Sequence, residues 1–279
     1  MTLESISSHL PQSVQKFVEH KSQWIEGLKD INDADLFSSI DTVLEKGDFK
    51  KSTKPACFIG RAVQELGIRK LSSKEKSKLE KIKDKVRKVA KCCLVDGVNV
   101  PEVAGITINE KNSHVYGQKV KDFFEKWKKS KTSKDFNDYL KENLSSKQLK
   151  ALKKSIVKYL NPHNAKKYAI IFDKNGYVQQ NGKLLEDGVH MFSLNLNATK
   201  LYAGKKEKGK FHHSSFTSGD PVQCAGNFII KNGKISAAKL ESGHYRPDDA
   251  AGKRLRKYLT DDSRLGKQAK DFNIFNHKK

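Results

Sequence analysis

Two clusters of side chains able to do chemistry lie between Lys205 and Asp248. The first is His212-His213-Ser214-Ser215, and the second is Gly243-His244-Tyr245-Arg246-Pro247-Asp248. Imidazoles and carboxylates move protons, whereas hydroxyls and a guanidinium bind phosphate oxygens. A predicted hairpin within residues 216–241 would return the second cluster to the first. The spacing therefore predicts one site that binds phosphate or transfers protons.

The candidate catalytic residues are Ser214, Ser215, His244 and Asp248. Asp248 follows His244 by four residues, a spacing that lets a carboxylate orient an imidazole or hold a metal ion. In this interpretation His244 is the base that activates an attacking oxygen, and a serine hydroxyl binds phosphate. The alternative is structural: Asp248 complements a helix dipole, His244 bonds the backbone, and the serines close a turn.

The candidate phosphate- and substrate-binding residues surround these groups and are His213, Lys206, Lys210, Tyr245 and Arg246. Arg246 offers a planar fork to a phosphate, and the lysines neutralise further charge. Tyr245 is a candidate for stacking on a nucleobase. The alternatives are that the lysines are solvated and that the tyrosine packs in the core.

The elements that must position these clusters change type along the chain. Helical periodicity runs from Leu3 to about Asp48, with Asn32 or Asp33 as a cap, and further helices are expected over residues 113–128 and 133–142. Two capping boxes, at residues 72–75 and 145–148, predict helices that end near Cys92 and at Leu160.

Short β-branched and aromatic runs then follow, separated by Asn-Gly turns at residues 175–176, 181–182 and 232–233. They predict strands over residues 168–172, 177–180, 191–196, 200–203, 223–230 and 234–239. Pro247 suits the first position of a last helix. The fold class is therefore α+β: a helical N-terminal half, then an antiparallel β meander or partly open barrel, then a C-terminal helix.

This pattern divides the chain into four parts. They are an acidic helical N-terminal arm (residues 1–50), a basic helical segment and loop (51–112), an α+β catalytic-like domain (113–262) and a loosely attached basic tail (263–279). The arm carries five Lys against nine acidic residues, whereas residues 51–170 carry thirty Lys plus Arg against twelve. The amphipathic basic helix from Ser73 to Cys92 is either a surface helix of the fold or a calmodulin target.

The composition limits the remaining possibilities. The formal net charge is +23, but only seven of the 55 basic residues are Arg, so a dedicated nucleic-acid surface is not expected. No apolar run is long enough to span a bilayer, and the start lacks a secretory signal pattern. The four cysteines form no CxxC pair and no metal-ligand spacing, which indicates a reducing intracellular compartment.

Several segments resemble the conserved domain of the plant and fungal IQ-motif calmodulin-binding proteins. They are Lys158-Tyr159-Leu160-Asn161-Pro162, Leu201-Tyr202-Ala203-Gly204, Phe211-His212-His213-Ser214-Ser215-Phe216 and Ser242-Gly243-His244-Tyr245-Arg246-Pro247. The likeness covers about residues 113–260. The chain contains no IQ motif itself, because the nearest segment, Ala62 to Arg69, departs from that pattern at several positions.

The same two clusters are similar to bacterial toxins and secreted effectors with a Ser plus His-x-x-x-Glu signature, which transfer AMP from ATP to proteins. That resemblance implies a eukaryotic protein activator, actin or calmodulin, and a protein substrate. It also implies ATP and Mg²⁺ as cofactors, with Asp248 near the metal, and a protein that is cytoplasmic in the producing cell and is secreted into the host cell cytoplasm. Asp248 departs from the signature Glu. The alternative function is a non-catalytic calmodulin-binding or regulatory protein-interaction module.

Overall fold

The structure is a computed structural model that describes residues 3–18, 27–49, 54–88, 103–104, 113–115, 120–134, 136–153, 156–243, 245, 247–260 and 272–276. Its helices are η1 (Glu4–His9), α1 (Gln12–Val18), η3 (Leu28–Asp30), α3 (Asp33–Lys46), α4 (Lys54–Gly67), α5 (Ser73–Lys88), α6 (Lys121–Lys129), α7 (Phe136–Asn143), α8 (Ser146–Lys153), α9 (Pro162–Ala165), η6 (Lys166–Tyr168), η7 (His213–Ser215) and α10 (Asp249–Thr260).

The strands form two sheets. The small one has the order β1 (Val103–Ala104), β2 (Ser113–Val115), β3 (Ile156–Lys158). The large one comprises β4 (Ala169–Phe172), β5 (Val178–Gln180), β6 (Lys183–Leu184), β7 (Gly188–Asn195), β8 (Leu201–Gly204), β9 (Val222–Lys231), β10 (Lys234–Leu240) and β11 (Asn273–Asn276), in the order β11-β10-β9-β7-β8-β4-β5-β6. All pairs in it are antiparallel except β10 with β11. The α+β fold class is therefore confirmed, with an open sheet.

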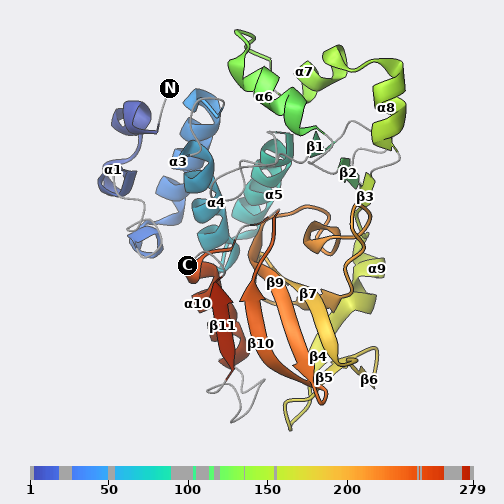
Figure 1. Cartoon of the computed structure of the whole chain (residues 1–279). Coiled ribbons are helices and arrows are strands. Elements are labelled where there is room, and N and C mark those ends of the chain that lie inside the picture. The colour runs from blue at the N-terminus through green and yellow to red at the C-terminus, as the bar shows by residue number, and fades with distance from the viewer. Residues whose placement is uncertain are drawn as a thin grey trace.

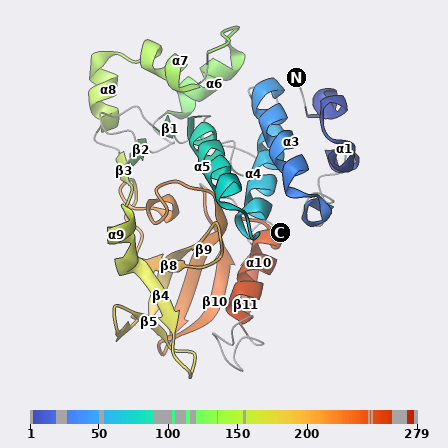
Figure 2. The ribbon, with the colours of Figure 1, turned by 180° about the vertical axis from the view of Figure 1, so that it is seen from behind.

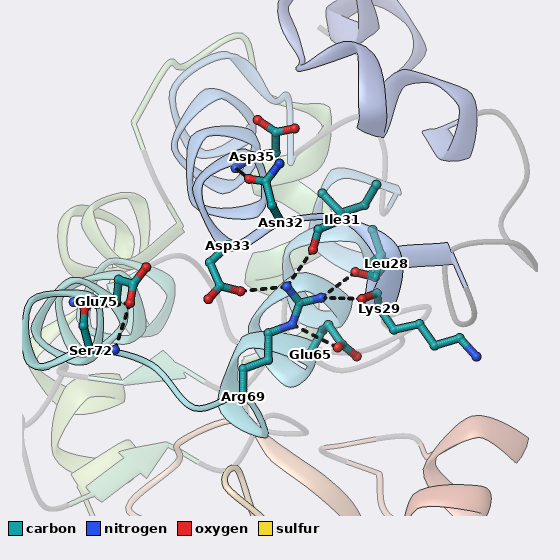
Figure 3. A network of polar contacts seen from close by, with 10 residues as sticks. All are labelled: Leu28, Lys29, Ile31, Asn32, Asp33, Asp35, Glu65, Arg69, Ser72 and Glu75. Atoms are coloured by element: carbon teal, nitrogen blue, oxygen red, sulfur yellow. Dashed lines mark hydrogen bonds and ion pairs between the residues drawn. The ribbon is translucent and has the colours of Figure 1, made fainter.

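The N-terminal helices share one core, because apolar side chains of η1, α1, α3, α4 and α5 pack together. Asn32 caps α3 by accepting from the Asp35 amide, and Ser72 with Glu75 forms the predicted capping box of α5. Arg69 joins α4 to the preceding helices. Its guanidinium donates to the carboxylates of Asp33 and Glu65 and to three backbone carbonyls (Figure 3).

Helices α6, α7 and α8 form a separate small bundle, which lies at the top of Figure 1 away from the large sheet. Phe124, Trp127 and Phe136 pack against one another at its centre, with ring centroids 5.1–5.5 Å apart. The capping box at Ser145 and Gln148 is present as predicted. Within the described residues, no helix is long and apolar enough to cross a membrane.

The two faces of the large sheet are covered differently. On one face, Phe192, Leu194 and Phe228 pack with Leu255 and Leu259 of α10. On the other, residues of α9, η6 and the segment around η7 pack over β7 and β8. Figure 2 shows α10 beside β10 and β11, and α4 and α5 above the sheet. The large sheet is therefore held between α10 and the loop that carries the first histidine cluster.

The structure corrects several predicted elements. The helix expected to reach Leu160 ends at Lys153, because residues 156–158 form β3 against β2. The helix expected from Ser113 begins at Lys121, since residues 113–115 form β2. In the tail, residues 273–276 pair with β10 as β11. In each case a short strand finds its partner far away in sequence, which local periodicity does not show.

Candidate functional site

The first histidine cluster forms a closed 3-10 turn, η7, against the sheet. The Gly209 amide donates to Nε2 of His212 at 2.9 Å, so that nitrogen is an acceptor and its lone pair is occupied. His213 has Nε2 3.0 Å from the carbonyl oxygen of Gly226, so that nitrogen donates. Both rings are buried. The two imidazoles therefore fasten η7 to its own loop and to β9.

The two serines lie in the same turn, fully buried. Ser215 Oγ accepts from the His212 amide at 2.9 Å, the bond that closes η7. Ser214 Oγ has no hydrogen-bond partner among the described residues. Since neither hydroxyl is exposed, a phosphate would reach them only if the turn opened.

The second cluster is described in part, because His244 and Arg246 lie outside the described residues. Tyr245 is buried, and its hydroxyl lies 2.7 Å from the Asp220 carbonyl oxygen and 3.2 Å from Thr217 Oγ1. The predicted hairpin thus returns Tyr245 to the turn that follows the serines. Tyr245 packs with Val222 and Ala225. This is the packing in the core that the sequence analysis gave as the alternative to stacking on a nucleobase.

Asp248 has two structural partners. Its Oδ1 accepts from the Ala251 amide at 3.0 Å, which caps α10, and its Oδ2 accepts from the Arg61 guanidinium of α4. The side chains of Arg61 and Asp248 are only 16% and 26% exposed. The Asp248 carboxylate, a candidate metal ligand from the sequence, therefore connects the first turn of α10 to α4 in the N-terminal half.

This contact belongs to a larger junction between α4, β9 and α10 that the sequence did not indicate. Gln64 Nε2 donates to the Val222 carbonyl, and Gln223 Nε2 donates to the Gln64 carbonyl at 2.7 Å. Arg254 of α10 donates to the Gln223 carbonyl and to Gln64 Oε1, each at 3.1 Å. The partners are 31–190 residues apart in sequence, so no local pattern reveals the junction.

Burial shapes the electrostatics of the junction. Desolvation lowers the pKa of Arg254 to about 10, an effect increased by Arg61 and opposed by Asp248. Desolvation also raises the pKa of the neighbouring Cys224 thiol to about 12. Cys224 is therefore a buried, protonated thiol rather than a nucleophile.

The lysines of the candidate site remain at the surface. Lys206 and Lys210 are exposed, and Lys205 donates to Glu186 at 2.7 Å. Within the described part of the chain, no three His, Cys, Asp or Glu side chains are placed to hold a metal ion. Binding of ATP or Mg²⁺ stays a prediction.

The basic helix α5 is attached to both halves of the molecule. Leu79 and Ile82 of α5 are buried in the helical core. Lys83 is also buried, and its ammonium lies 2.8 Å from Glu80 and 3.0 Å from Asp220 in the turn after η7. The face that α5 leaves exposed is charged, and it includes Lys74, Lys76, Lys78, Lys81 and Lys85.

One protein-family model covers both histidine clusters and every strand of the large sheet except β11. Residues 164–251 match the IQ motif-containing protein middle domain. The span runs from α9 into α10, so it contains η7, Tyr245 and Asp248 but not the N-terminal helices.

Similar proteins carry the same family name. The chain is 32% identical over 148 residues to IQ domain-containing protein IQM3 of Arabidopsis thaliana and 34% identical over 151 residues to IQM2 of the same plant. Each match covers 49% of this chain, but only 32% and 25% of the relative. The chain thus spans at most about a third of these curated relatives. No solved structure matches it significantly.

These findings correct the interpretation of the chain as a toxin or bacterial effector transferase. The relatives are IQ domain-containing plant proteins, and none of their names indicates nucleotidyl transfer, AMPylation, ATP binding or actin dependence. The physical reason for the error is that Ser215 and Asp248, which resembled a signature, have partners that close η7 and cap α10.

Proposed function

We propose that the chain is a non-catalytic regulatory module that binds an acidic protein, with calmodulin as the first partner to test. The binding element is the exposed face of α5. This helix carries eight Lys plus Arg against three acidic residues. Such a field attracts an acidic surface and accelerates its encounter.

The observation that carries the proposal is the position of α5. Leu79 and Ile82 are buried in the helical core, while Lys74, Lys76, Lys78, Lys81 and Lys85 are exposed. Lys83 links the helix to Asp220, close to the histidine turn. A partner that neutralises the exposed lysines would therefore act where the helical half meets the sheet.

The family likeness supports a partner of the calmodulin type, because the relatives are named as IQ domain-containing proteins. This chain has no IQ pattern, and the nearest segment lies in α4 with Ala62, Val63 and Leu66 fully buried. We therefore place the contact on α5. The bonding of Ser215, His213 and Asp248 within the fold supports a role without catalysis.

The test is calorimetric titration of the full chain with calmodulin, in calcium and in chelator. The variant Lys74→Glu/Lys81→Glu reverses two exposed charges of α5 without touching its buried face. Exposed charge contacts contribute up to about 1 kcal/mol each, so reversing two should weaken binding by about tenfold or more. Higher salt should weaken the wild-type complex.

The matched control is Lys147→Glu/Lys150→Glu on α8, where both lysines are exposed on another basic helix. It should change the affinity by less than about twofold if the contact is local to α5. If the two double variants weaken calmodulin binding equally, the interaction depends on the net charge of the chain and not on α5 in particular. Absence of micromolar binding in either condition would reject calmodulin as the partner.

A further inference from the structure

A groove of about 750 Å³ lies between the α4–α5 turn and the sheet half. Leu66, Leu71 and Leu79 contribute one apolar wall, and Leu160 and Phe216 lie among the residues of the other. Its size is that of a small-molecule site, and such sites combine apolar walls with a few polar groups.

Most polar groups along the groove already have partners in the protein. The carboxylates of Glu80 and Asp220 are both bound to Lys83. Arg69 is bound to Asp33 and Glu65. A ligand would therefore find little hydrogen-bonding capacity in these residues.

The turn at residues 195–200 is likewise closed on itself. Asn195 Oδ1 accepts from the amides of Thr199 and Lys200, and Thr199 Oγ1 donates to Asn197 Oδ1. Ser218 Oγ, which also lines the groove, donates to the Leu160 carbonyl. These contacts leave the groove lining largely satisfied.

Lys76 and Tyr202 are among the lining groups that remain free to donate. Lys76 is exposed on α5 and forms no ion pair with a described residue. Tyr202 is only 8% exposed, and its hydroxyl has no hydrogen-bond partner among the described residues. Burial raises the pKa of Tyr202, so the hydroxyl stays protonated at neutral pH. The Tyr202 ring stacks on Phe216 at 6.0 Å, which fixes it in the wall.

We propose that this groove binds a small amphipathic molecule with an aliphatic or aromatic body and one carboxylate head. The body lies between the leucines of the helical half and the Tyr202–Phe216 stack. The head accepts hydrogen bonds from the Tyr202 hydroxyl and the Lys76 ammonium. A carboxylate satisfies this arrangement because it accepts from two donors, and hydrogen bonds to a charged group are the stronger ones.

The probe is decanoate, titrated calorimetrically into the full chain, with decanol and decylammonium as comparators of equal chain length. Decanoate should bind about tenfold more tightly than either, because only it accepts from both donors with a charge. Tyr202→Phe keeps the ring and should weaken decanoate binding about tenfold. Lys76→Gln should weaken it about threefold, since its contact is exposed.

Two further variants separate the groove from the general surface. Lys74→Gln removes an exposed charge of α5 that does not line the groove, and it should leave the affinity unchanged. Thr199→Trp, at an exposed lining position, should block the groove and abolish binding. The proposal is overturned if decanoate does not bind, if all three probes bind alike, or if Tyr202→Phe and Lys76→Gln match the wild type.

Discussion

Asp248 offers the sharpest test of whether the second histidine cluster is structural. Its carboxylate caps α10 and pairs with Arg61, and both side chains are mostly buried. Loss of an N-cap costs about 1 kcal/mol, and loss of a partly buried charged hydrogen bond costs about 2 kcal/mol. Asp248→Ala should therefore lower the free energy of unfolding by about 3 kcal/mol.

Asp248→Asn separates the two contributions. Asn is as good an N-cap as Asp, so only the charge interaction is lost and the expected cost is about 2 kcal/mol. Arg61→Met should cost about 1 kcal/mol, less than the loss of Asp248, because the carboxylate still interacts with Arg254. The assay is urea unfolding at neutral pH, with the double variant added to measure the coupling of the pair.

The reasoning has a clear point of failure. Replacing a catalytic acid commonly leaves stability unchanged or raises it, because active sites are not optimised for stability. If Asp248→Asn and Asp248→Ala both stay within about 0.5 kcal/mol of the wild type, the structural assignment of Asp248 is wrong. If the two variants lower the free energy of unfolding equally, Asp248 does not stabilise α10 as its N-cap, and only that part of the assignment is wrong.

Three further predictions concern the core and the junction. Cys224 should resist alkylation in the folded chain at pH 8 and react once urea unfolds it, because burial raises its thiol pKa to about 12; reaction at the rate of a free thiol would contradict this. Gly226→Ala should destabilise the chain by about 3 kcal/mol or prevent folding, since a Cβ would lie 2.1 Å from the Lys239 carbonyl oxygen. A Cβ at Gly243 would meet no atom within 4 Å, so Gly243→Ala is the control in the same urea series. Lys83→Met should cost about 2 kcal/mol by removing the partly buried ion pair with Asp220. Burial alone lowers the Lys83 pKa, but Asp220 and Glu80 outweigh this effect and raise the pKa. The stabilisation by the ion pair is therefore full below pH 10.5 and should disappear as the amine deprotonates at higher pH. If wild type and Lys83→Met lose the same free energy of unfolding on alkaline titration, this expectation is refuted.

Local signals were enough to predict much of the fold. The capping boxes at Ser72 and Ser145 lie at the helix starts they predict. Asn181-Gly182 and Asn232-Gly233 adopt positive φ at both positions, as tight hairpins require. These elements depend on interactions within a few residues, which sequence shows directly.

The site was predicted less well than the fold, because its contacts join residues that are far apart in the sequence. Nothing near Arg61 and Gln64 in the sequence points to Asp248 and Val222, which they bind 187 and 158 residues away. The spacing of the serines and histidines predicts a cluster, but spacing does not show that Ser215 closes a buried turn. Burial distinguishes a catalytic serine from a structural one, and the sequence alone does not show which serines are buried.

The junction between α4 and β9 also decides where this chain can be divided. A fragment limited to residues 164–251 would lack Gln64, Arg61 and most of α10, so the Gln223 amide would lose its bond to the Gln64 carbonyl and the Asp248 carboxylate its ion pair with Arg61. Leu196, which packs in the helical core, would face water. Expression of the sheet as an independent unit therefore requires a start before Lys54 and an end after Asn276, so that β11 is included.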